Sequence, residues 1–465
     1  MQHRHIAVID IGKTNAKLAL VDLDSLTELA VRTTPNRVLP GPPWPHFDAD
    51  ALWAFLLAGL RDLHAAHRID AIAVTTHGAA AALIAADGSL AAPILDYEHP
   101  GPDDTAAEYD ALRPPFTETG SPRLLMGLNL GAQLHWQSLA DPGLAARTAH
   151  VLPLPQYWAF RLTGVPAADV TSLGCHTDLW NPTARTFSTL RDRLSLADGI
   201  PVPRLPGDML GPVLPAVAAA TGLGPGTPVT CGIHDSNASL LPHLLSRKPP
   251  FAVVSTGTWV ICMAIGGRPV TLDPARDTLV NVNALGDPVP SARFMGGREF
   301  DLIRAGSTIV PSAADLADVL SRTAMLLPSV EPRSGPFPGR THRWTVPETK
   351  LPEGQRMAAL AFYLALMTTE CLTSTGANGP TVVEGPFARN HAYLAMLASA
   401  TSRPVIPSPG STGTSLGAAL LFSTGSSPAG NVADPQPILP DTALHPYAEA
   451  WRAAATVSPD GSESP

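Results

Sequence analysis

Near the N-terminus, polar side chains interrupt a stretch that is otherwise apolar. Backbone N–H groups of a tight turn can cradle phosphate oxygens, and glycine permits a close approach. Thr and Asn side chains add neutral donors, while lysines add positive charge. A carboxylate could bind a phosphate only through Mg²⁺ and its waters, because this ion takes oxygen ligands and keeps several waters. The sequence "VIDIGKTNAKLALV" (8–21) contains all of these groups: Asp10, Gly12, Lys13, Thr14, Asn15 and Lys17.

This turn does not have the pattern of a Walker loop. Gly12-Lys13-Thr14 resembles the end of such a loop, but that motif needs a glycine five positions earlier and a helix afterwards. Position 7 is Ala7, and the residues after Asn15 alternate with the period of a strand. We therefore expect strands over 5–11 and 16–22. The turn between them is either a phosphate site or an ordinary polar hairpin.

A second turn of the same kind opens the C-terminal half. "FAVVSTGTWVICMAIGG" (251–267) again places a polar turn between two apolar runs, with Thr256, Gly257 and Thr258 in it. A repeat in register favours phosphate binding at both turns. Two similar α/β halves with facing turns would form a cleft that could hold a ligand with several phosphates.

Asp235 is the strongest candidate for acid–base chemistry. The segment "TPVTCGIHDSNASLLPHLL" (227–245) predicts a strand that runs into a helix, with His234 and Asp235 at the junction. A carboxylate in this place could accept a proton from a hydroxyl. The alternative is a helix N-cap, because Asp, Ser and Asn are all good caps. His234 is open to the same two interpretations.

Two more polar clusters follow predicted strands of the N-terminal half. "TTHG" (75–78) contains His77 and Gly78, and "DYEHP" (96–100) contains Asp96 and Tyr97. Ligands of open α/β sheets bind outside the carboxyl ends of strands. These residues indicate either a site for a hydroxyl-rich substrate or ordinary strand-to-loop chemistry.

Other segments must position these groups. The hydrophobic pattern predicts helices within 48–67, 144–164 and 357–375, with Asp48 or Asp50 as cap of the first. It predicts a strand over 71–78, a hairpin over 82–95 and a strand–loop–helix–strand unit over 381–406. Residues 99–128 read as irregular, 328–353 as a surface loop and 456–465 as a frayed tail.

Composition narrows the class of protein. The chain has 465 residues, of which 45% are hydrophobic and 15% charged, which favours two or more domains with large cores. A net charge of -9 disfavours nucleic acid or an anionic membrane as partner. No secretory signal or spanning segment is evident, and the four scattered cysteines fit small buried side chains in a reducing cytoplasm.

Four motifs in chain order resemble the FGGY carbohydrate kinases, within the actin–hexokinase–sugar kinase fold. "DIGKTNAK" is similar to the first phosphate motif, and "GIHDSNAS" to the motif that carries the catalytic base. "STGTW" is similar to the second phosphate motif. "EGPFARN", followed by "STGTSLGAAL", is similar to the adenosine motif and the closing helix.

The resemblance implies an α/β fold of two ribonuclease-H-like (actin-like ATPase) domains with a cleft between them. We expect a sugar-binding domain over 1–246, a nucleotide-binding domain over 250–453 and a flexible tail over 454–465. The resemblance also implies ATP and Mg²⁺ as cofactors, Asp235 as catalytic base and Asp10 as a metal ligand through water. The substrate set is His77, Gly78, Asp96, Tyr97, His234 and Asp235. The nucleotide set is Gly12, Lys13, Thr14, Asn15, Lys17, Thr256, Gly257, Thr258, Gly385, Phe387 and Asn390.

The sequence also departs from the family pattern. Lys13, Asn15 and Lys17 replace the usual Thr, Ser and Arg, and Lys lacks the fork of Arg. Pro386 and Phe387 stand where the adenosine loop usually has glycines, so nucleotide preference is open. The pair His234-Asp235 is similar to that of rhamnulokinases and fuculokinases, which favours a deoxyketose such as L-rhamnulose or L-fuculose.

Two other functions remain open on the same fold. One is a sugar- or nucleotide-binding regulator without turnover, and the other is a chaperone-like ATPase, for which no separate peptide-binding domain follows. Retention of Asp235 favours the kinase. The oligomeric state, including a homodimer, is left open by the sequence.

Overall fold

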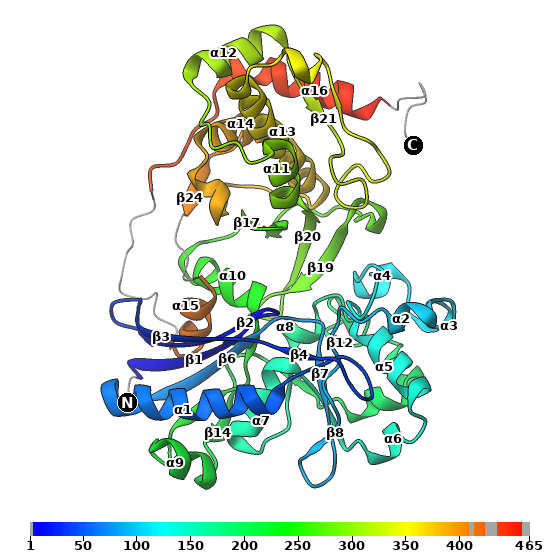
Figure 1. Ribbon diagram of the computed structural model, residues 1–465, viewed down its shortest axis with the longest axis vertical. Helices are drawn as coiled ribbons and strands as arrows, with labels where there is room; N and C mark the ends of the chain where they lie inside the picture. The colour runs from blue at the N-terminus through cyan, green and yellow to red at the C-terminus, as the bar shows by residue number, and fades with distance from the viewer. Residues whose placement is uncertain (1–2, 409–412, 424–434, 458–465) are drawn as a thin grey trace. The chain divides into compact units, whose positions relative to one another are not determined.

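The computed structural model describes residues 3–408, 413–423 and 435–457 (Figure 1). The chain divides into two compact units. Unit 1 comprises Met1–Arg247, Val280–Pro288 and Thr412–Asn431, and unit 2 comprises Lys248–Leu279, Val289–Ser411 and Val432–Pro465. The expected contiguous ranges 1–246 and 250–453 stay a prediction about functional domains. Two segments from the second range, Val280–Pro288 and Thr412–Asn431, belong to unit 1 by their packing. Val282 is buried among residues of unit 1, and residues 413–419 pack on its sheet.

The main sheet of unit 1 is built around the first hairpin. Its strand order is β14-β15-β6-β1-β2-β3, with β16 also paired to β6. β1 and β2 are antiparallel, with Asp10 opposite Lys17, and β1 and β6 are parallel. The strand bounds are β1 His5–Ile11, β2 Asn15–Asp22, β3 Thr27–Pro35, β6 Ala71–Thr76, β14 Met209–Pro212, β15 Pro228–Thr230 and β16 Ile233–His234.

Helices cover both faces of this sheet (Figure 1). Ile9 and Ile11 of β1 belong to one apolar cluster, with α1 and α7, whereas Ile6 and Val8 belong to another, with α10 and α15. Successive strand residues point to opposite faces, so an apolar run such as "IAVI" is what a strand buried on both sides requires. The helix bounds are α1 Ala49–His67, α7 Leu154–Thr163, α10 Asp235–Ser246 and α15 Gly413–Ala419.

The remaining elements of unit 1 are short. They include a sheet ordered β8-β7-β9 and three two-stranded pairs. Its strands are β7 Ala81–Ile84, β8 Leu90–Ala92 and β9 His150–Pro153, and the pairs are β4 Val38–Leu39 with β5 His46–Phe47, β10 Ala168–Asp169 with β13 Pro203–Arg204, and β11 Trp180–Asn181 with β12 Thr186–Phe187. The helices are α2 Gly101–Asp104, α3 Ala106–Leu112, α4 Phe116–Thr119, α5 Leu130–Ala140, α6 Leu144–Arg147, α8 Val170–Leu173 and α9 Pro215–Thr221, with 3₁₀ turns at Arg191–Arg193, Ser195–Gly199 and Leu420–Phe422.

Unit 2 repeats the local topology of unit 1. Its sheet has the order β19-β20-β18-β17-β23-β24, in which β17 and β18 form an antiparallel hairpin and β17 is parallel to β23. This matches β1, β2 and β6 in unit 1, so the repeat predicted from the two polar turns is confirmed. The strand bounds are β17 Phe251–Thr256, β18 Val260–Ile265, β19 Thr278–Val282, β20 Pro288–Phe294, β23 Thr381–Glu384 and β24 Val405–Ser408.

The core of unit 2 is formed around α13, Glu353–Ser374. Among the described residues, α13 alone is long and apolar enough to cross a membrane, and 83% of its apolar window is buried inside the protein, as in a core helix. The other elements are α11 Gly296–Arg304, α12 Ala313–Arg322, α14 His391–Thr401, α16 His445–Thr456, the pair β21 Leu326–Leu327 and β22 Arg343–Trp344, and 3₁₀ turns at Pro274–Arg276, Glu348–Lys350, Pro386–Arg389 and Thr442–Leu444.

Several predicted elements are confirmed. The hairpins at residues 8–21 and 251–267 form, and β2 rather than a helix follows the first turn, which excludes the Walker loop. Asp48 caps α1 by accepting a hydrogen bond from the Ala51 amide at 3.1 Å, and α7 ends at Gly164 in the left-handed region. All four cysteines are free and buried.

Other predictions were wrong in part. Residues 99–128, predicted to be irregular, contain α2, α3 and α4. The helix predicted within 144–164 is present as α7, and the strand β9 precedes it because residues 150–153 pair with β7. The stretch 328–353 is not wholly a surface loop: Ser329 and Glu331 are buried, and the Ser329 hydroxyl donates to the Phe337 carbonyl at 2.7 Å. The predicted motif at 411–420 begins outside the described residues and continues as α15. Of the predicted tail 454–465, residues 454–456 end α16, and residues 458–465 lie outside the described residues.

Candidate active site

The first turn is held by backbone and amide hydrogen bonds. The Gly12 amide donates to the Asn15 carbonyl at 2.9 Å, and the Asn36 side chain donates to the Gly12 carbonyl at 2.8 Å. A Cβ atom at residue 12 would stand 3.1 Å from the Asn15 carbonyl oxygen, which explains the glycine. The exposed Thr14 and Asn15 side chains, joined at 3.2 Å, leave this turn with polar groups available to a ligand.

Asp10 and Lys17 face each other across the hairpin. Lys17 Nζ lies 3.1 Å from Glu28 Oε1 and 3.8 Å from Asp10 Oδ2. Burial raises the pKa of Asp10 to about 6, a shift that Lys17 opposes and the charge of Asp235 reinforces. The negative charges of Asp10 and Asp235 therefore lie close enough to repel, an arrangement that a divalent cation would relieve.

The carboxylates of Asp10 and Asp235 fit a magnesium ion that is held mainly by water and by the phosphates of a ligand. The described residues contain no group of three or more His, Cys, Asp or Glu that could hold a metal by themselves. Mg²⁺ in kinases is commonly bound through one or two carboxylates, several waters and substrate phosphates. Asp10 would be the carboxylate, as the sequence suggests.

Lys13 has different partners from Lys17. Its ammonium contacts Asp96 Oδ1 and lies 3.2 Å from Glu98 Oε2. It also lies 4.9 Å from the centre of the Tyr97 ring and 5.1 Å from that of Phe47. The structure therefore places Lys13 with two members of the predicted substrate set, although the sequence suggested the nucleotide set.

Asp235 is the first residue of α10, not its N-cap. The cap position is His234, which makes no capping hydrogen bond through its side chain. Asp235 Oδ1 accepts from the Ser236 amide at 2.6 Å and from its hydroxyl at 3.3 Å. Oδ2 has no hydrogen-bonding partner among residues 3–408, 413–423 and 435–457. Asp235 is thus not the helix N-cap, which was the alternative to a catalytic role, and one of its carboxylate oxygens is left for a ligand.

His234 forms a buried chain of contacts beside Asp235. Its Nε2 lies 3.3 Å from Asp235 Oδ1 and 3.8 Å from Cys175 Sγ. Burial disfavours a charged imidazole, but Cys175 and Asp235 outweigh it and raise the pKa of His234 to about 10. The same attraction, with that of His176, overcomes burial and lowers the pKa of Cys175. Both neighbours therefore favour the protonated form of His234.

His77 completes a group of five residues that we call the acceptor cluster: His77, Asp96, Tyr97, His234 and Asp235. The ring centres of His77 and Tyr97 are 5.3 Å apart. Burial lowers the pKa of His77, which also feels the charges of Asp235, Lys13 and His234. Within the described residues, His77 Nε2 and His234 Nδ1 are buried without a hydrogen-bonding partner. Buried unpaired polar atoms are costly, so these two are suited to sugar hydroxyls.

Gly78 provides the room that His234 occupies. A Cβ atom at residue 78 would stand 2.7 Å from His234 Nε2 and 3.0 Å from its Cδ2. We expect Gly78→Ala to displace this buried imidazole and to lower kcat/KM roughly 10-fold or more, since small misplacements in a site are costly. Steady-state kinetics would measure this. Gly226→Ala is the control, because a Cβ there meets nothing within 4 Å. Equal kinetics for the two variants would contradict the expectation.

In unit 2, the two threonines of the second turn have different roles. Thr256 is buried; its hydroxyl donates to the Glu384 carbonyl and accepts from the Phe387 amide at 3.1 Å. It joins β17 to β23 and to the loop after it, so its hydroxyl is engaged within the protein, and phosphate binding by Thr256 stays a prediction. Gly257 and Thr258 are exposed at the tip of the turn.

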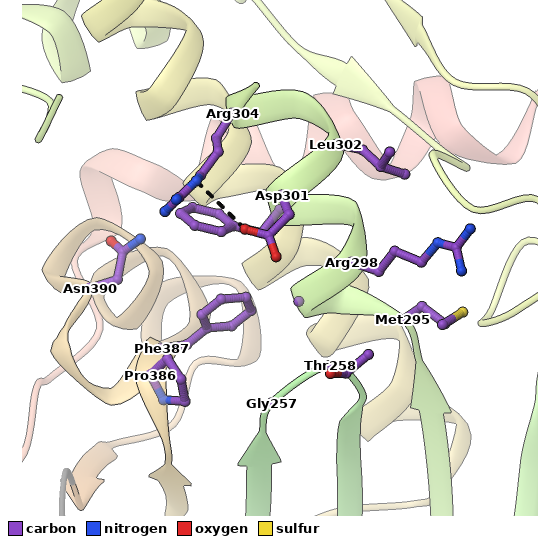
Figure 2. A pocket seen from close by; sticks show the side chains of 12 residues that line it. Gly257, Thr258, Met295, Arg298, Asp301, Leu302, Arg304, Pro386, Phe387 and Asn390 are labelled. Carbon is purple, nitrogen blue, oxygen red and sulfur yellow. Dashed lines mark ion pairs between the residues drawn. The ribbon is translucent and has the colours of Figure 1, made fainter. Parts of the chain in front are cut away.

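A cavity of about 750 Å³ opens beside this turn (Figure 2). Figure 2 shows Thr258 at one end of it, with Asn390 and Phe387 on one side and Asp301 and Arg298 on the other. The Phe300 and Phe387 rings meet edge to face at 5.8 Å, and the Arg304 guanidinium lies 5.4 Å from the Phe300 ring centre. The lining residues are Gly257, Thr258, Met295, Gly297, Arg298, Phe300, Asp301, Leu302, Arg304, Pro386, Phe387 and Asn390.

The predicted adenosine loop forms one wall of this cavity. Gly385 has φ +79°, and a Cβ there would stand 2.0 Å from the Thr256 carbonyl oxygen, so only glycine fits. Pro386–Arg389 is a 3₁₀ turn, and Asn390 caps α14 by accepting from the Tyr393 amide at 3.1 Å. Pro386 and Phe387 thus shape the wall, and the Phe387 amide is already bonded to Thr256.

Sequence reasoning missed the opposite wall, which α11 provides. Arg298, Phe300, Asp301 and Arg304 all come from this helix, and Arg304 Nε lies 3.5 Å from Asp301 Oδ1. The signal was the glycine pair that opens the helix in "MGGREF": a Cβ at Gly297 would stand 2.1 Å from the Gly257 carbonyl oxygen. Close approach of this helix to the turn therefore depends on that glycine.

The two threonines provide a matched test of the cavity. We expect Thr258→Ala to raise KM for ATP several-fold, about the worth of one hydrogen bond, without change in thermal stability. Thr256→Ala should instead lower the free energy of unfolding by about 1–3 kcal/mol, because it leaves a buried amide unpaired. Kinetics and thermal melts of both variants would measure this. Loss of stability in Thr258→Ala with an unchanged KM would contradict it.

Comparison with known proteins agrees with this architecture. The N-terminal domain model of the FGGY family of carbohydrate kinases matches residues 5–242, and the C-terminal domain model of carbohydrate kinase FGGY matches residues 248–429. The crystal structure of a carbohydrate kinase from Novosphingobium aromaticivorans is 37% identical, with a TM-score of 0.87 over 98% of this chain and 99% of that one.

More distant relatives share less. L-fuculokinase of Escherichia coli (strain K12) is 29% identical over 281 residues, which are 57% of this chain and 57% of that protein's length. Xylulose kinase from Rhodospirillum rubrum is 21% identical, with a TM-score of 0.77 over 97% of each chain, and shares the fold. With both family domains matched in order, the protein belongs to the FGGY family of carbohydrate kinases.

Proposed function

We propose that the protein transfers the γ-phosphoryl group of ATP to a hydroxyl of a sugar. The observation that carries this proposal is the state of Asp235. Its carboxylate lies at a strand–helix junction, does not cap the helix, and keeps Oδ2 free among the described residues. A carboxylate so placed can accept the proton of an attacking hydroxyl.

The acceptor cluster would bind and orient the sugar. His77 Nε2 and His234 Nδ1 are buried polar atoms without partners in the described part of the chain, and each would gain a hydrogen-bonding partner in a sugar hydroxyl. His234 Nε2 lies 3.3 Å from Asp235 Oδ1 and so helps to hold the carboxylate in place. Tyr97 and His77 provide an aromatic wall for the sugar ring or chain.

The nucleotide would be held by the cavity of unit 2. The Phe300 and Phe387 rings suit an adenine, while Thr258 and Gly257 suit its phosphates. On unit 1, the first turn (Gly12, Thr14, Asn15, Lys17) presents polar groups of the kind that bind phosphate. Mg²⁺, with Asp10 as its ligand through water, would neutralise charge on the transferred group. Phosphoryl transfer needs mostly positioning and charge neutralisation, which rigid hairpins can deliver.

For the sugar, we propose a ketose or deoxyketose, with L-fuculose and L-rhamnulose as first candidates. The support is the pair His234-Asp235 and the similarity to L-fuculokinase. We further infer a cytoplasmic enzyme that acts on small molecules, in keeping with its net charge of -9 and its four free cysteines.

The test is a coupled assay of ADP release with a panel of acceptors: L-fuculose, L-rhamnulose, D-xylulose, glycerol and D-gluconate. We expect turnover with at least one ketose and a much lower rate without acceptor. Sugar binding by calorimetry without any turnover would instead support a regulatory protein on the same fold.

A further inference from the structure

Lys13 is held in a cage on unit 1 that is built from residues distant in sequence. Its ammonium touches two carboxylates, Asp96 and Glu98, and two aromatic faces, those of Phe47 and Tyr97. The Lys13 side chain is only 18% exposed, and that of Asp96 10%. A partly desolvated ammonium with four partners is strongly localised.

The cage fixes the carboxylate of Asp96. Asp96 Oδ1 accepts from Lys13 and from the Glu98 amide at 3.2 Å, whereas Oδ2 has no partner in the described ranges. An ionised carboxylate accepts several hydrogen bonds, so Oδ2 remains available to a ligand donor. With Oδ1 anchored twice, the direction of Oδ2 is set by Lys13.

The other lysine of the same turn is used differently. Lys17 Nζ pairs with Glu28 and approaches Asp10, the proposed metal ligand. The two lysines thus have different partners. Lys17 lies near Asp10, whereas Lys13 contacts Asp96 and Tyr97 of the acceptor cluster. A phosphate ligand at Lys13 would have to compete with both carboxylates of the cage.

We propose that Lys13 is a positioning and specificity-determining residue for the sugar, and that it does not serve as a phosphate ligand. Lys13 orients the Asp96 carboxylate so that Oδ2 accepts a hydrogen bond from one sugar hydroxyl. The two carboxylates of Asp96 and Glu98 exceed the single positive charge of Lys13, so the cage repels a negatively charged ligand. The site therefore selects neutral polyhydroxyl acceptors over sugar acids. This inference rests on the proposed kinase function and names the substrate class of the same site.

The test compares Lys13→Met with Lys17→Met. We expect Lys13→Met to raise KM for the best panel sugar, with L-fuculose as first probe, about 10-fold or more, the scale of a lost charge-assisted hydrogen bond. KM for ATP should change less than about twofold, because the phosphates are bound elsewhere. Lys17→Met should show the opposite split. A raised KM for ATP with an unchanged KM for sugar in Lys13→Met would overturn the proposal, as would no change in either.

Chemical rescue separates positioning from general damage. In Lys13→Ala, added n-propylammonium should enter the cage and lower KM for the sugar again, since it replaces the deleted atoms. A variant with only a damaged fold would not respond, and absence of rescue in a well-folded variant would count against the cage. In Asp96→Asn, the freed ammonium should raise kcat/KM for D-gluconate relative to the neutral sugar; an unchanged ratio would refute the charge argument.

Wild-type data distinguish this inference from the proposed function. If the wild type binds a panel sugar by calorimetry but transfers no phosphoryl group, the kinase proposal fails, and Lys13→Met can still be judged by its sugar affinity. If the wild type phosphorylates a sugar with unchanged kinetics in Lys13→Met, only the role of Lys13 fails. If it binds no panel sugar, both fall together.

Discussion

Asp235→Asn is expected to lower kcat by about 10²-fold or more, the scale of general-base catalysis, with little change in either KM. The amide cannot take the proton of a hydroxyl, but its oxygen can still accept from the Ser236 amide as Oδ1 does at 2.6 Å. The start of α10 should therefore persist, and circular dichroism and thermal melting should match the wild type. Single-turnover kinetics would measure the chemical step directly.

Ser236→Ala is the matched control for this experiment. It removes the 3.3 Å contact between the Ser236 hydroxyl and Asp235 Oδ1 while leaving the carboxylate in place. We expect its kcat to stay within a few-fold of the wild type, because the backbone amide still holds Oδ1. Near-normal turnover by a folded Asp235→Asn enzyme would refute the base and would favour the regulatory alternative.

Asp10→Asn is expected to lower kcat by about 10²-fold or more and to raise the Mg²⁺ concentration needed for half-maximal rate, since metal-assisted charge stabilisation is worth several kcal/mol. Burial raises the pKa of Asp10 to about 6. The native state therefore binds this proton more tightly than the unfolded chain, and stability falls as pH rises from about 4 to about 6. The neutral Asn should thus leave thermal stability unchanged or improved at pH 7.5. Rates measured over a Mg²⁺ titration, with thermal melts, would test both statements.

Glu28→Gln provides the control for Asp10. Glu28 is the other carboxylate that contacts Lys17, at 3.1 Å, but it lies on β3 and is not a proposed metal ligand. If Asp10 acts only by holding Lys17, the two variants should lose activity to a similar extent. Comparable losses in both, with no shift in Mg²⁺ dependence, would remove Asp10 from the metal site.

The positions of Asp10, Thr14 and Asp235 at element ends were predictable from the sequence. Each follows an apolar run whose alternation or length predicts a buried strand, and such a strand must end in groups that water or a ligand can reach. The local choice between cap and free carboxylate at Asp235 was not predictable, because Asp, Ser and Asn cap equally well. The structure decides it through the helix start at Asp235 itself.

Local sequence is enough to predict the two hairpins, their polar turns and the repeat between the halves, because period-two alternation and turn chemistry act over a few neighbouring residues. The partners of those turns depend instead on contacts between residues far apart in the chain. Lys13 meets Asp96 across 83 positions, and Thr256 meets Glu384 across 128. A lysine can direct its ammonium to any carboxylate within reach of its flexible chain. The second cavity wall also depends on tertiary contacts, since β20, which precedes α11, pairs with β18 in the sheet, and Gly297 of α11 lies against the Gly257 carbonyl.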